Sequence, residues 1–366
     1  MPAVTTAIVS DLHLGTASGM DVARRPEARA RLLEIAARAE RLVLLGDLLE
    51  LRERPTPAVL ADVAPLLREL GEATAGRQVV IVPGNHDYQL VAPALERARL
   101  EDERPLAPAG EHPPLPGELA DVVAALMPRS EVVFAYPGVW LREDVYALHG
   151  HYLDAHMTVP RVECLLAAAV ERFTTGLGAA GPRSAEQYEA VLAPIYALSN
   201  ALAQNARVRP ATRRGNLSRN VWSAANGDGR AGRIKGALIG KAAIPAAVAA
   251  INAAGMGPFE ADISGEQLRR AGLRAIGEVV GRLGIDADHV VFGHTHRAGP
   301  LDGEADGWTL PNGTRLTNTG SWVHEETFVG GSGPSNPYWP GRVTLLHDDG
   351  PPELTTVLGD LEPAPA

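Results

Sequence analysis

Short runs of apolar residues alternate with longer amphipathic segments over the first part of the chain. Residues 7–9, 42–45 and 79–82 contain only Ala, Val, Ile and Leu, which is typical of strands buried on both faces. Between these runs, residues 21–40 and 56–71 space their apolar positions as helices do, and Thr56-Pro57 offers a capping hydroxyl followed by proline at the first helical position. This β-α-β alternation predicts a layered α/β fold in which helices cover a sheet.

Further strands are predicted near the middle and the end of the chain. Residues 132–136 and 290–292 are apolar runs, and residues 139–141 and 145–148 flank three polar residues, as in a hairpin. Residues 101–118 are rich in Pro, Gly and Glu, which predicts a surface loop.

Residues 154–286 have a different pattern, because helical periodicity replaces the strand runs. Apolar side chains between residues 162 and 173, and again between 188 and 202, fall on one helical face. Ser184 and Ser264 are each followed three residues later by Gln, which is the capping-box pattern that opens a helix. The segment is far longer than a connection between two strands requires.

We therefore expect a core in two parts with a helical insert between them. The core comprises residues 1–153 and 287–358, and the insert, a cap or lid, comprises residues 154–286. A stabilising appendage without substrate contact is the alternative for the insert. Residues 359–366 end in a Pro- and Ala-rich run and are expected to be a disordered tail.

Polar residues of a restricted kind follow most of the predicted strands directly. The clusters read Asp11-Leu12-His13, Gly46-Asp47-Leu48-Leu49-Glu50, Gly84-Asn85-His86-Asp87, His149-Gly150-His151 and Gly293-His294-Thr295-His296. Strands of an α/β fold gather such residues at one edge of the sheet. A mixture of Asp, Asn and His is what two adjacent divalent cations of hard or borderline character require.

The composition of the chain limits which partners and which cellular compartment are expected. The 366 residues suggest about two domains, and the net charge of −10 disfavours nucleic acid as a general partner. Cys164 is the only cysteine, so no internal disulfide is possible and a reducing compartment is expected. No signal-peptide pattern precedes the first cluster, and no convincing membrane-spanning stretch is present. The expectation is a soluble cytoplasmic protein.

The insert carries a local concentration of basic residues in this acidic chain. Steering of a phosphorylated substrate, contact with anionic lipid or nucleic acid, and a merely solvated loop are all open interpretations. The neighbouring Ala-rich residues 236–255 could form an apolar lid surface or part of a core. The basic residues are Arg207, Arg209, Arg213, Arg214, Arg219, Arg230, Arg233 and Lys235.

Taken together, the five polar clusters resemble those of the calcineurin-like metallophosphoesterase superfamily. Its pattern runs Asp-x-His, Gly-Asp-x-x-Asp/Glu, Gly-Asn-His-Asp/Glu, His and Gly-His-x-His, and the chain carries every element in that order. The resemblance implies an αββα sandwich with an inserted helical cap. It also implies two divalent metal ions (Mn, Fe or Zn).

The resemblance assigns a role to each cluster residue. Asp47 would bridge the two metals, and His86 would act as the catalytic histidine with Asp87 orienting its ring. Asn85 suits a metal site beside an anionic substrate because its neutral oxygen adds no negative charge. The first metal would be held by Asp11, His13 and His296, and the second by Asn85, His149 and His294.

The implied function is dinuclear, metal-dependent hydrolysis of a phosphate ester or anhydride by metal-activated hydroxide. The substrate would be small or lipid-linked, because the helical insert resembles that of bacterial UDP-2,3-diacylglucosamine hydrolases, and peripheral membrane contact through the insert is open. That group typically has Arg at the position of His86 and Asp at that of His151, which puts this substrate in doubt. An Mre11/SbcD-like nuclease is the alternative enzyme, and a metal-free scaffold is the alternative without activity.

Several other polar residues keep open interpretations. Glu50 is expected to support a ligand or cap a helix rather than bind metal. His151 either lines the phosphate site, orients a ligand, or is simply partly buried. His156, His289 and His347 are expected to be ordinary packing or surface histidines.

Overall fold

The chain divides into two units that are described in turn. The first comprises Met1–His151, Asn200–Arg209 and Ile285–Ala366, and the second comprises Tyr152–Ser199 and Pro210–Gly284. The computed structural model describes residues 4–101, 105–177, 181–205, 244–262, 264–304, 306–330 and 332–360. The basic cluster, residues 236–243 of the Ala-rich stretch and residues 361–366 of the predicted tail lie outside these ranges.

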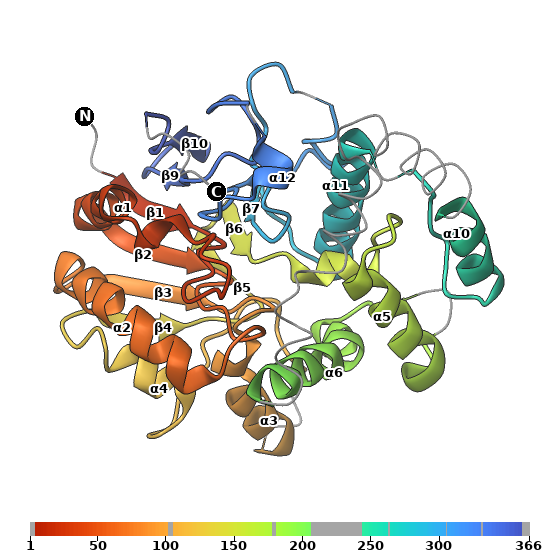
Figure 1. Ribbon diagram of the computed structural model, residues 1–366, viewed down its shortest axis with the longest axis horizontal. Coiled ribbons are helices and arrows are strands. Elements are labelled where there is room, and N and C mark those ends of the chain that lie inside the picture. Colours follow the sequence, from red (N-terminus) through yellow and green to blue (C-terminus); the bar gives the residue numbers. More distant parts are fainter. Residues whose placement is uncertain are drawn as a thin grey trace. The chain divides into compact units, whose positions relative to one another are not determined.

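A six-stranded sheet forms the centre of the first unit. Its order is β10-β9-β1-β2-β3-β4. The strands β1 to β4 are parallel, so the arrowheads of β1, β2 and β3 point the same way in Figure 1. β9 and β10 join the edge beyond β1 in antiparallel fashion. The bounds are β1 Val4–Val9, β2 Ala39–Leu45, β3 Gln78–Val82, β4 Glu131–Phe134, β9 Arg342–Leu346 and β10 Glu353–Thr356.

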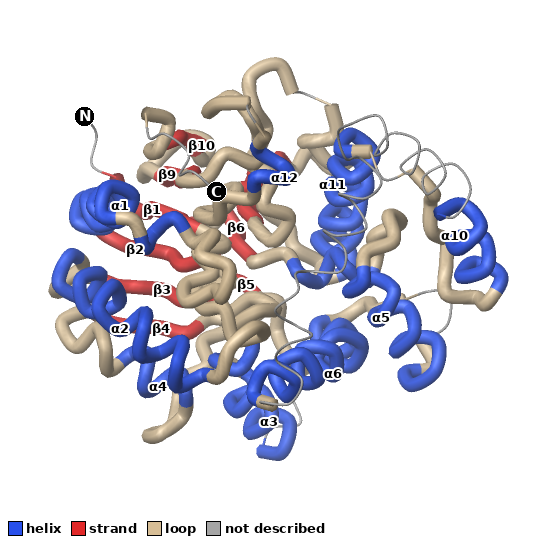
Figure 2. The backbone as a smooth tube through the Cα atoms, in the orientation of Figure 1, coloured by secondary structure: helices blue, strands red, loops and turns tan. Residues whose placement is uncertain are grey.

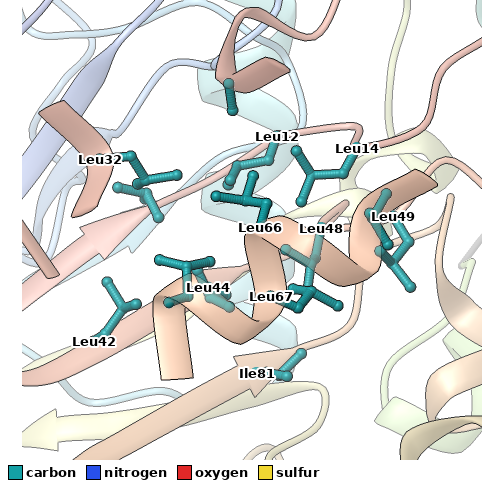
Figure 3. Packing of buried hydrophobic residues seen from close by; sticks show 14 of the residues in the cluster. Leu12, Leu14, Leu32, Leu42, Leu44, Leu48, Leu49, Leu66, Leu67 and Ile81 are labelled. Carbon is teal, nitrogen blue, oxygen red and sulfur yellow. The ribbon is translucent and has the colours of Figure 1, made fainter. Parts of the chain in front are cut away.

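Helices cover one face of this sheet with an apolar layer. α1 (Pro26–Arg38), α2 (Thr56–Ala73) and α4 (Leu119–Ala124) contribute buried residues to the same hydrophobic cluster as alternate strand residues. Figure 3 shows Leu32 of α1 and Leu66 and Leu67 of α2 beside the strand residues Leu42, Leu44 and Ile81. Burial of these side chains holds the strands in position. The polar clusters follow directly after these strands, so their positions are set as well.

Two sequence predictions for these helices need correction. The helix expected over residues 21–40 is a 3-10 turn, η1 (Val22–Arg24), followed by α1, and residues 39–40 already belong to β2. Thr56 is the first residue of α2 rather than its cap, Pro55 occupies the cap position, and no side chain caps the helix. Proline restricts its own backbone to a φ that suits this position.

The other face of the large sheet packs against a second sheet of order β5-β6-β7-β8. Ile8, Val43 and Val80 point to this side, in a second cluster with Val145 and Val291, because successive strand residues alternate between faces. The predicted hairpin is present as β5 and β6. These two packed sheets confirm the predicted α/β class and the two-sheet sandwich. The bounds are β5 Gly138–Arg142, β6 Val145–Leu148, β7 His289–Phe292 and β8 Arg315–Asn318.

Short helical segments complete the first unit. η2 (Tyr88–Leu90) and α3 (Ala92–Glu101) follow the third polar cluster, and α12 (Glu326–Val329) lies near the end of the chain. The loop predicted over residues 101–118 has no helix or strand over residues 105–118.

Among the described residues of the second unit the regular structure is helical, as Figure 2 shows for α5, α6, α10 and α11. Ser264 caps α11 by accepting a hydrogen bond from the backbone N–H of Gln267. The predicted capping box is not completed, because the side chain of Gln267 donates to Glu260 and the N–H of Ser264 donates to Asp262. None of the described helices combines the length and the apolar character that crossing a bilayer requires. The bounds are η3 His151–Ala155, α5 Val162–Val170, the π-helical turn η4 Glu171–Thr175, α6 Ala185–Gln204, α10 Ile244–Ala253 and α11 Gly265–Arg282. His151 of η3 and Asn200–Gln204 of α6 belong to the first unit.

Candidate metal centre

The polar clusters meet at the carboxyl ends of strands from both sheets. Asp11 follows β1, Asp47 follows β2, Asn85 follows β3, His149 follows β6 and His294 follows β7. Backbone bonds hold the cluster loops together: the N–H of Asp11 donates to Gly46 O at 3.0 Å, and that of Gly293 donates to His149 O at 2.9 Å. Because parallel neighbours end at the same edge, five distant segments present their side chains to one place.

Asp11, His13 and His296 form the first set of convergent side chains. Nε2 of His296 lies 3.3 Å from Oδ1 of Asp11 and 3.1 Å from Nε2 of His13. One ligating atom from each of the three residues lies within 4.8 Å of the others. Oδ1 of Asp11 is buried and makes no hydrogen bond to any described residue. This is a donor set that fits a divalent cation.

Asp47, His149 and His294 form the second set, with their ligating atoms again within 4.8 Å of one another. Nε2 of His149 lies 3.3 Å from Oδ2 of Asp47. Asn85 joins this set, because its Oδ1 lies 3.1 Å from Nδ1 of His294.

Asp47 faces both sets at once. Its Oδ2 lies 3.6 Å from Nε2 of His13 in the first set and 3.3 Å from Nε2 of His149 in the second. Its Oδ1 accepts a hydrogen bond from the backbone N–H of His86 at 2.8 Å. One carboxylate oxygen between two ligand sets is the geometry that a bridging ligand needs.

The electrostatics of the centre favour bound positive charge. Burial by itself would raise the pKa of Asp11, but contacts with His13 and the nearby His149 and His296 outweigh it and hold the pKa well below its ordinary value. Burial by itself would lower the pKa of His149, yet Asp47 and Asp11 raise it to about 9. Buried carboxylates that stay ionised and attract positive charge are suited to holding cations.

The backbone is strained at the ligand positions. Asp11, His13, Asp47, His294 and His296 have φ values of 53°, 45°, 50°, 66° and 59°, and they are the non-glycine residues with positive φ within the described ranges. Such conformations cost on the order of 1–3 kcal/mol each and concentrate at functional sites. The cost indicates that the loops are shaped for ligand placement rather than for stability alone.

Glycines allow the loops to approach one another closely. A Cβ on Gly84 would lie 2.2 Å from Oδ1 of Asp47, and one on Gly293 would lie 2.6 Å from Oδ2 of Asp11. No side chain fits at either position, so the third and fifth clusters need glycine to bring Asn85 and His294 to the centre.

His86 lies beside the first set, but its partner is not the one expected. Nδ1 of His86 lies 2.6 Å from Oε2 of Glu50. The carboxylate of Asp87 instead accepts the backbone N–H groups of Gly84 at 2.7 Å, Leu48 at 2.7 Å and Leu49 at 3.2 Å. The prediction that Asp87 orients the His86 ring is therefore wrong.

Glu50 contacts two histidines through one oxygen. Its Oε2 lies 3.1 Å from Nδ1 of His13 as well as 2.6 Å from Nδ1 of His86, and its Oε1 accepts the backbone N–H of Arg52 at 2.9 Å. Burial would raise the pKa of Glu50, but His86 and His13 outweigh burial and hold the pKa far below its usual value. An ionised Glu50 therefore orients both rings, and it does not cap α2.

Residues outside the five clusters also reach the centre. Nη1 of Arg52 lies 3.3 Å from Nε2 of His86, and Nδ1 of His296 lies 3.1 Å from Oε1 of Glu325. The amide of Asn318 donates to Gly293 O at 3.0 Å and to Oγ1 of Thr295 at 2.9 Å, which pins the loop between β7 and β8. The spacing of Glu325 and Arg52 carries no signal that would have identified them from sequence.

The remaining histidines take different places. His151 is buried, its Nε2 lies 3.0 Å from the hydroxyl of Tyr136, and its ring lies 5.5 Å from that of His149. His289 lies in β7, and His347 lies 3.8 Å from a carboxylate oxygen of Glu353. His156 belongs to the second unit, where its Nε2 lies 2.6 Å from the hydroxyl of Tyr188.

The protein is an α/β protein with two packed sheets, and the strand ends carry adjoining carboxylate, amide and imidazole groups that form a candidate metal centre. Residues 4–169 match the model of the calcineurin-like phosphoesterase family. This match confirms the resemblance that the polar clusters carry, and it covers the first four of them. No curated protein matches the chain at a significant level.

Solved structures that are similar to part or most of the chain include a nuclease and a dimetal phosphatase. A nuclease, MPE of Pseudomonas putida, is 26% identical over 40% of this chain and 55% of its own, with a TM-score of 0.24. The chain thus spans little more than half of that nuclease. A dimetal phosphatase from Danio rerio is 14% identical over 95% of this chain and 94% of its own, with a TM-score of 0.35.

Proposed function

We propose that the protein hydrolyses phosphate ester or anhydride bonds with a pair of divalent cations, by metal-activated hydroxide. The observation that carries this proposal is the position of Asp47, whose Oδ2 lies within 3.6 Å of a histidine nitrogen from each ligand set. Cations about 3.5–4 Å apart, when bound, acidify a shared water and neutralise phosphate charge.

The proposed ligands form two groups, one for each cation. Asp11, His13 and His296 would hold the first, and Asn85, His149 and His294 would hold the second, with Asp47 shared. Mn, Fe and Zn all suit such mixed nitrogen and oxygen ligands.

We propose that His86 supplies a proton to the leaving oxygen. Glu50 occupies its Nδ1, so the tautomer with a proton on Nδ1 leaves the lone pair of Nε2 towards Arg52 and Asp47, at 3.3 Å and 4.0 Å. When both nitrogens carry protons, Nε2 can donate one to a departing alkoxide or phosphate. The guanidinium of Arg52 beside it supplies positive charge where phosphate oxygens would lie.

For the substrate we propose a small or lipid-linked phosphate compound rather than nucleic acid. The net charge of −10 and the helices α5, α6, α10 and α11, which lie between residues 154 and 286, support this choice. We propose that this segment acts as a cap, and that its surface permits peripheral membrane contact. The single cysteine supports a reducing compartment, for which we propose the cytoplasm.

The test is hydrolysis of bis-p-nitrophenyl phosphate by metal-free protein with and without added Mn²⁺. We expect Mn²⁺-dependent turnover that the isosteric variant Asp47→Asn lowers at least about 10²-fold, on the scale of losing a group that stabilises transition-state charge. Asp302→Asn, in an exposed loop, is the matched control and should retain full turnover.

Other outcomes of the same test select the alternatives. Mn²⁺-dependent degradation of single-stranded DNA in preference to small phosphate esters would favour a nuclease. Detergent-sensitive hydrolysis of an acylated nucleotide would favour the lipid-linked substrate. Protein that binds no metal and hydrolyses none of these compounds would be a scaffold, and the proposal would be wrong.

A further inference from the structure

The loop between β2 and α2 brings a guanidinium to the edge of the metal centre. Nη1 of Arg52 lies 3.3 Å from Nε2 of His86, and the same Nε2 lies 4.0 Å from Oδ2 of Asp47, the oxygen that faces both ligand sets. Arg52 is half-buried. Arginine offers donors and no acceptor, so Arg52 cannot be a metal ligand, and its charge beside the centre suits an anion.

Glu50 fixes Arg52 and His86 relative to each other. Its Oε1 accepts the backbone N–H of Arg52 at 2.9 Å, and its Oε2 lies 2.6 Å from Nδ1 of His86. The side chain of Glu50 is 3% exposed, so both contacts are made in a largely dry setting, where hydrogen bonds to a charged group are strong. One buried carboxylate therefore sets the places of the Arg52 backbone and the His86 ring.

The residues after Arg52 anchor the same loop to the loop that follows β1. Oε2 of Glu53 accepts the hydroxyl of Thr16 at 2.8 Å, and Nη1 of Arg54 donates to Gly15 O at 3.0 Å. These contacts hold the backbone on the far side of Arg52 as Glu50 holds it on the near side. A side chain on a backbone that is already held loses less freedom when it binds a ligand.

The charge of Arg52 matches one class of phosphate compound better than another. A phosphate with one ester or anhydride bond has three terminal oxygens and about 1.5–2 negative charges at neutral pH, whereas a diester has two such oxygens and one charge. Two cations, when bound, neutralise part of this charge. The additional terminal oxygen of the monoester needs a further positive partner, and a guanidinium is suited to bind it.

We propose that Arg52 is a specificity-determining residue that favours phosphate monoesters, and terminal anhydride phosphates, over diesters. In a diester, a second ester group without charge takes the place of the oxygen that Arg52 binds. The inference rests on the proposed function and names the class of substrate for the same site.

The experiment compares Mn²⁺-loaded full-length protein and its variants on p-nitrophenyl phosphate, a monoester, and bis-p-nitrophenyl phosphate, a diester. We expect the unaltered protein to have the higher kcat/KM for the monoester. Arg52→Gln should lower kcat/KM for the monoester about 10–100-fold, on the scale of losing a hydrogen bond to a charged group. It should change the value for the diester little and leave the bound metal unchanged.

A second measurement needs no turnover. Calorimetric titration of the Mn²⁺-loaded protein with inorganic phosphate and with dimethyl phosphate, a diester anion, reports binding alone. Arg52→Gln should weaken binding of inorganic phosphate by a factor similar to that for monoester turnover. Binding of dimethyl phosphate should stay as it is.

Arg68→Gln is the matched control, because it removes the same charge from an exposed position on α2. It should leave both substrates and both anions unaffected. Arg52→Lys keeps the charge but not the planar fork of donors, so it should show a smaller loss that is again confined to the monoester and to inorganic phosphate. It provides the test if Arg52→Gln does not show a cooperative thermal transition.

Equal losses for the monoester and the diester in the Arg52 variants would mean that Arg52 acts only through the position of His86, and they would overturn the inference. Unchanged values for both substrates, or a higher kcat/KM of the unaltered protein for the diester, would also overturn it. If the unaltered protein hydrolysed neither compound with Mn²⁺, the proposed function itself would be wrong.

Discussion

His149 in the first unit is buried and His156 in the second is half-buried, and their pKa values shift in opposite directions. Asp47 and Asp11 outweigh burial and raise the pKa of His149 to about 9. His156 lies against the hydroxyl of Tyr188, and burial, with Arg282, lowers its pKa to about 4. Burial and a nearby cation thus keep His156 neutral, whereas the carboxylates that face His149 make its position favourable for positive charge.

The same contrast extends to the groups around each histidine. In the first unit the loops that carry Asp47 and His294 are strained and held close by glycine. In the second unit Tyr152 and Tyr188 stack with ring centroids 4.6 Å apart and 7° between their planes. Burial raises the pKa of the Cys164 thiol well above its usual value, so this group also stays neutral. The buried polar groups named here thus form candidate ligand sets in the first unit, whereas Tyr152, Tyr188 and Cys164 of the second unit are neutral groups that pack.

The largest effect is expected from a side chain at Gly84, where the loop after β3 approaches the loop that carries Asp47. Gly84→Ala would place a Cβ 2.2 Å from Oδ1 of Asp47 and 2.7 Å from its backbone nitrogen, so the loop must move. A displacement of about 1 Å can cost about 10²-fold in rate, and we expect at least that loss in hydrolysis together with loss of one metal equivalent. Turnover and bound metal are the measurements.

Gly333→Ala is the matched control, since a Cβ there meets nothing within 4 Å. It should leave turnover and metal content unchanged. Normal metal content and rate in Gly84→Ala would show that the close approach of the two loops is not needed for the centre.

A smaller effect is expected from Asp87, which supports the loops rather than His86. Asp87→Asn replaces one of two accepting oxygens with a donor, so at least one of the N–H groups of Gly84, Leu48 and Leu49 loses its partner. A buried unsatisfied group costs about 1–3 kcal/mol, and urea unfolding of metal-free protein should show that loss. Asp302→Asn, which is exposed, should show none.

The variant also separates the two roles considered for Asp87. If Asp87 oriented His86, the pH profile of kcat would change in Asp87→Asn and not in Glu50→Gln. We expect the reverse, because Glu50 is the residue that contacts Nδ1 of His86.

Sequence alone predicted those parts of the site that a strand places directly. Asp11, Asp47 and His294 each follow a buried strand, so the parallel order of the sheets brings them together. The position of Asp87 next to His86 in the sequence suggested a contact that the structure does not have. The Asp87 carboxylate accepts backbone N–H groups, and Glu50, which lies 36 residues before His86, contacts the His86 ring. Glu325 lies 29 residues after His296 in the sequence. Most of the chain between them is irregular, so no periodic pattern predicts that the two side chains meet.

Backbone conformation was the other feature that sequence did not indicate. Five non-glycine residues of the candidate centre have positive φ. Nothing in the sequence around these Asp and His residues distinguishes them from ordinary loop residues. The strain exists only because the packed strands hold both ends of each loop. Thr56 failed as a predicted cap for a related reason, because Pro55 already sets the entry to α2.

The smallest expected effect is a pH dependence that belongs to the second unit. The pKa of His156 is about 4 in the folded protein, below its ordinary 6.5, so the unfolded chain binds more protons between these values. Stability from this group is therefore fully present above pH 6.5 and falls as the pH falls towards 4, by up to about 2 kcal/mol at pH 5. His156→Phe should remove this fall from the pH dependence of the free energy of unfolding.

Tyr188→Phe is the matched control, because it removes the hydroxyl that contacts His156 and leaves the imidazole buried. Since burial rather than this hydroxyl lowers the pKa, the control should keep the fall in stability below pH 6.5. If His156→Phe and the unaltered protein lose the same stability between pH 6.5 and 5, the pKa of His156 is not lowered by folding. The contrast between His156 and His149 would then be wrong.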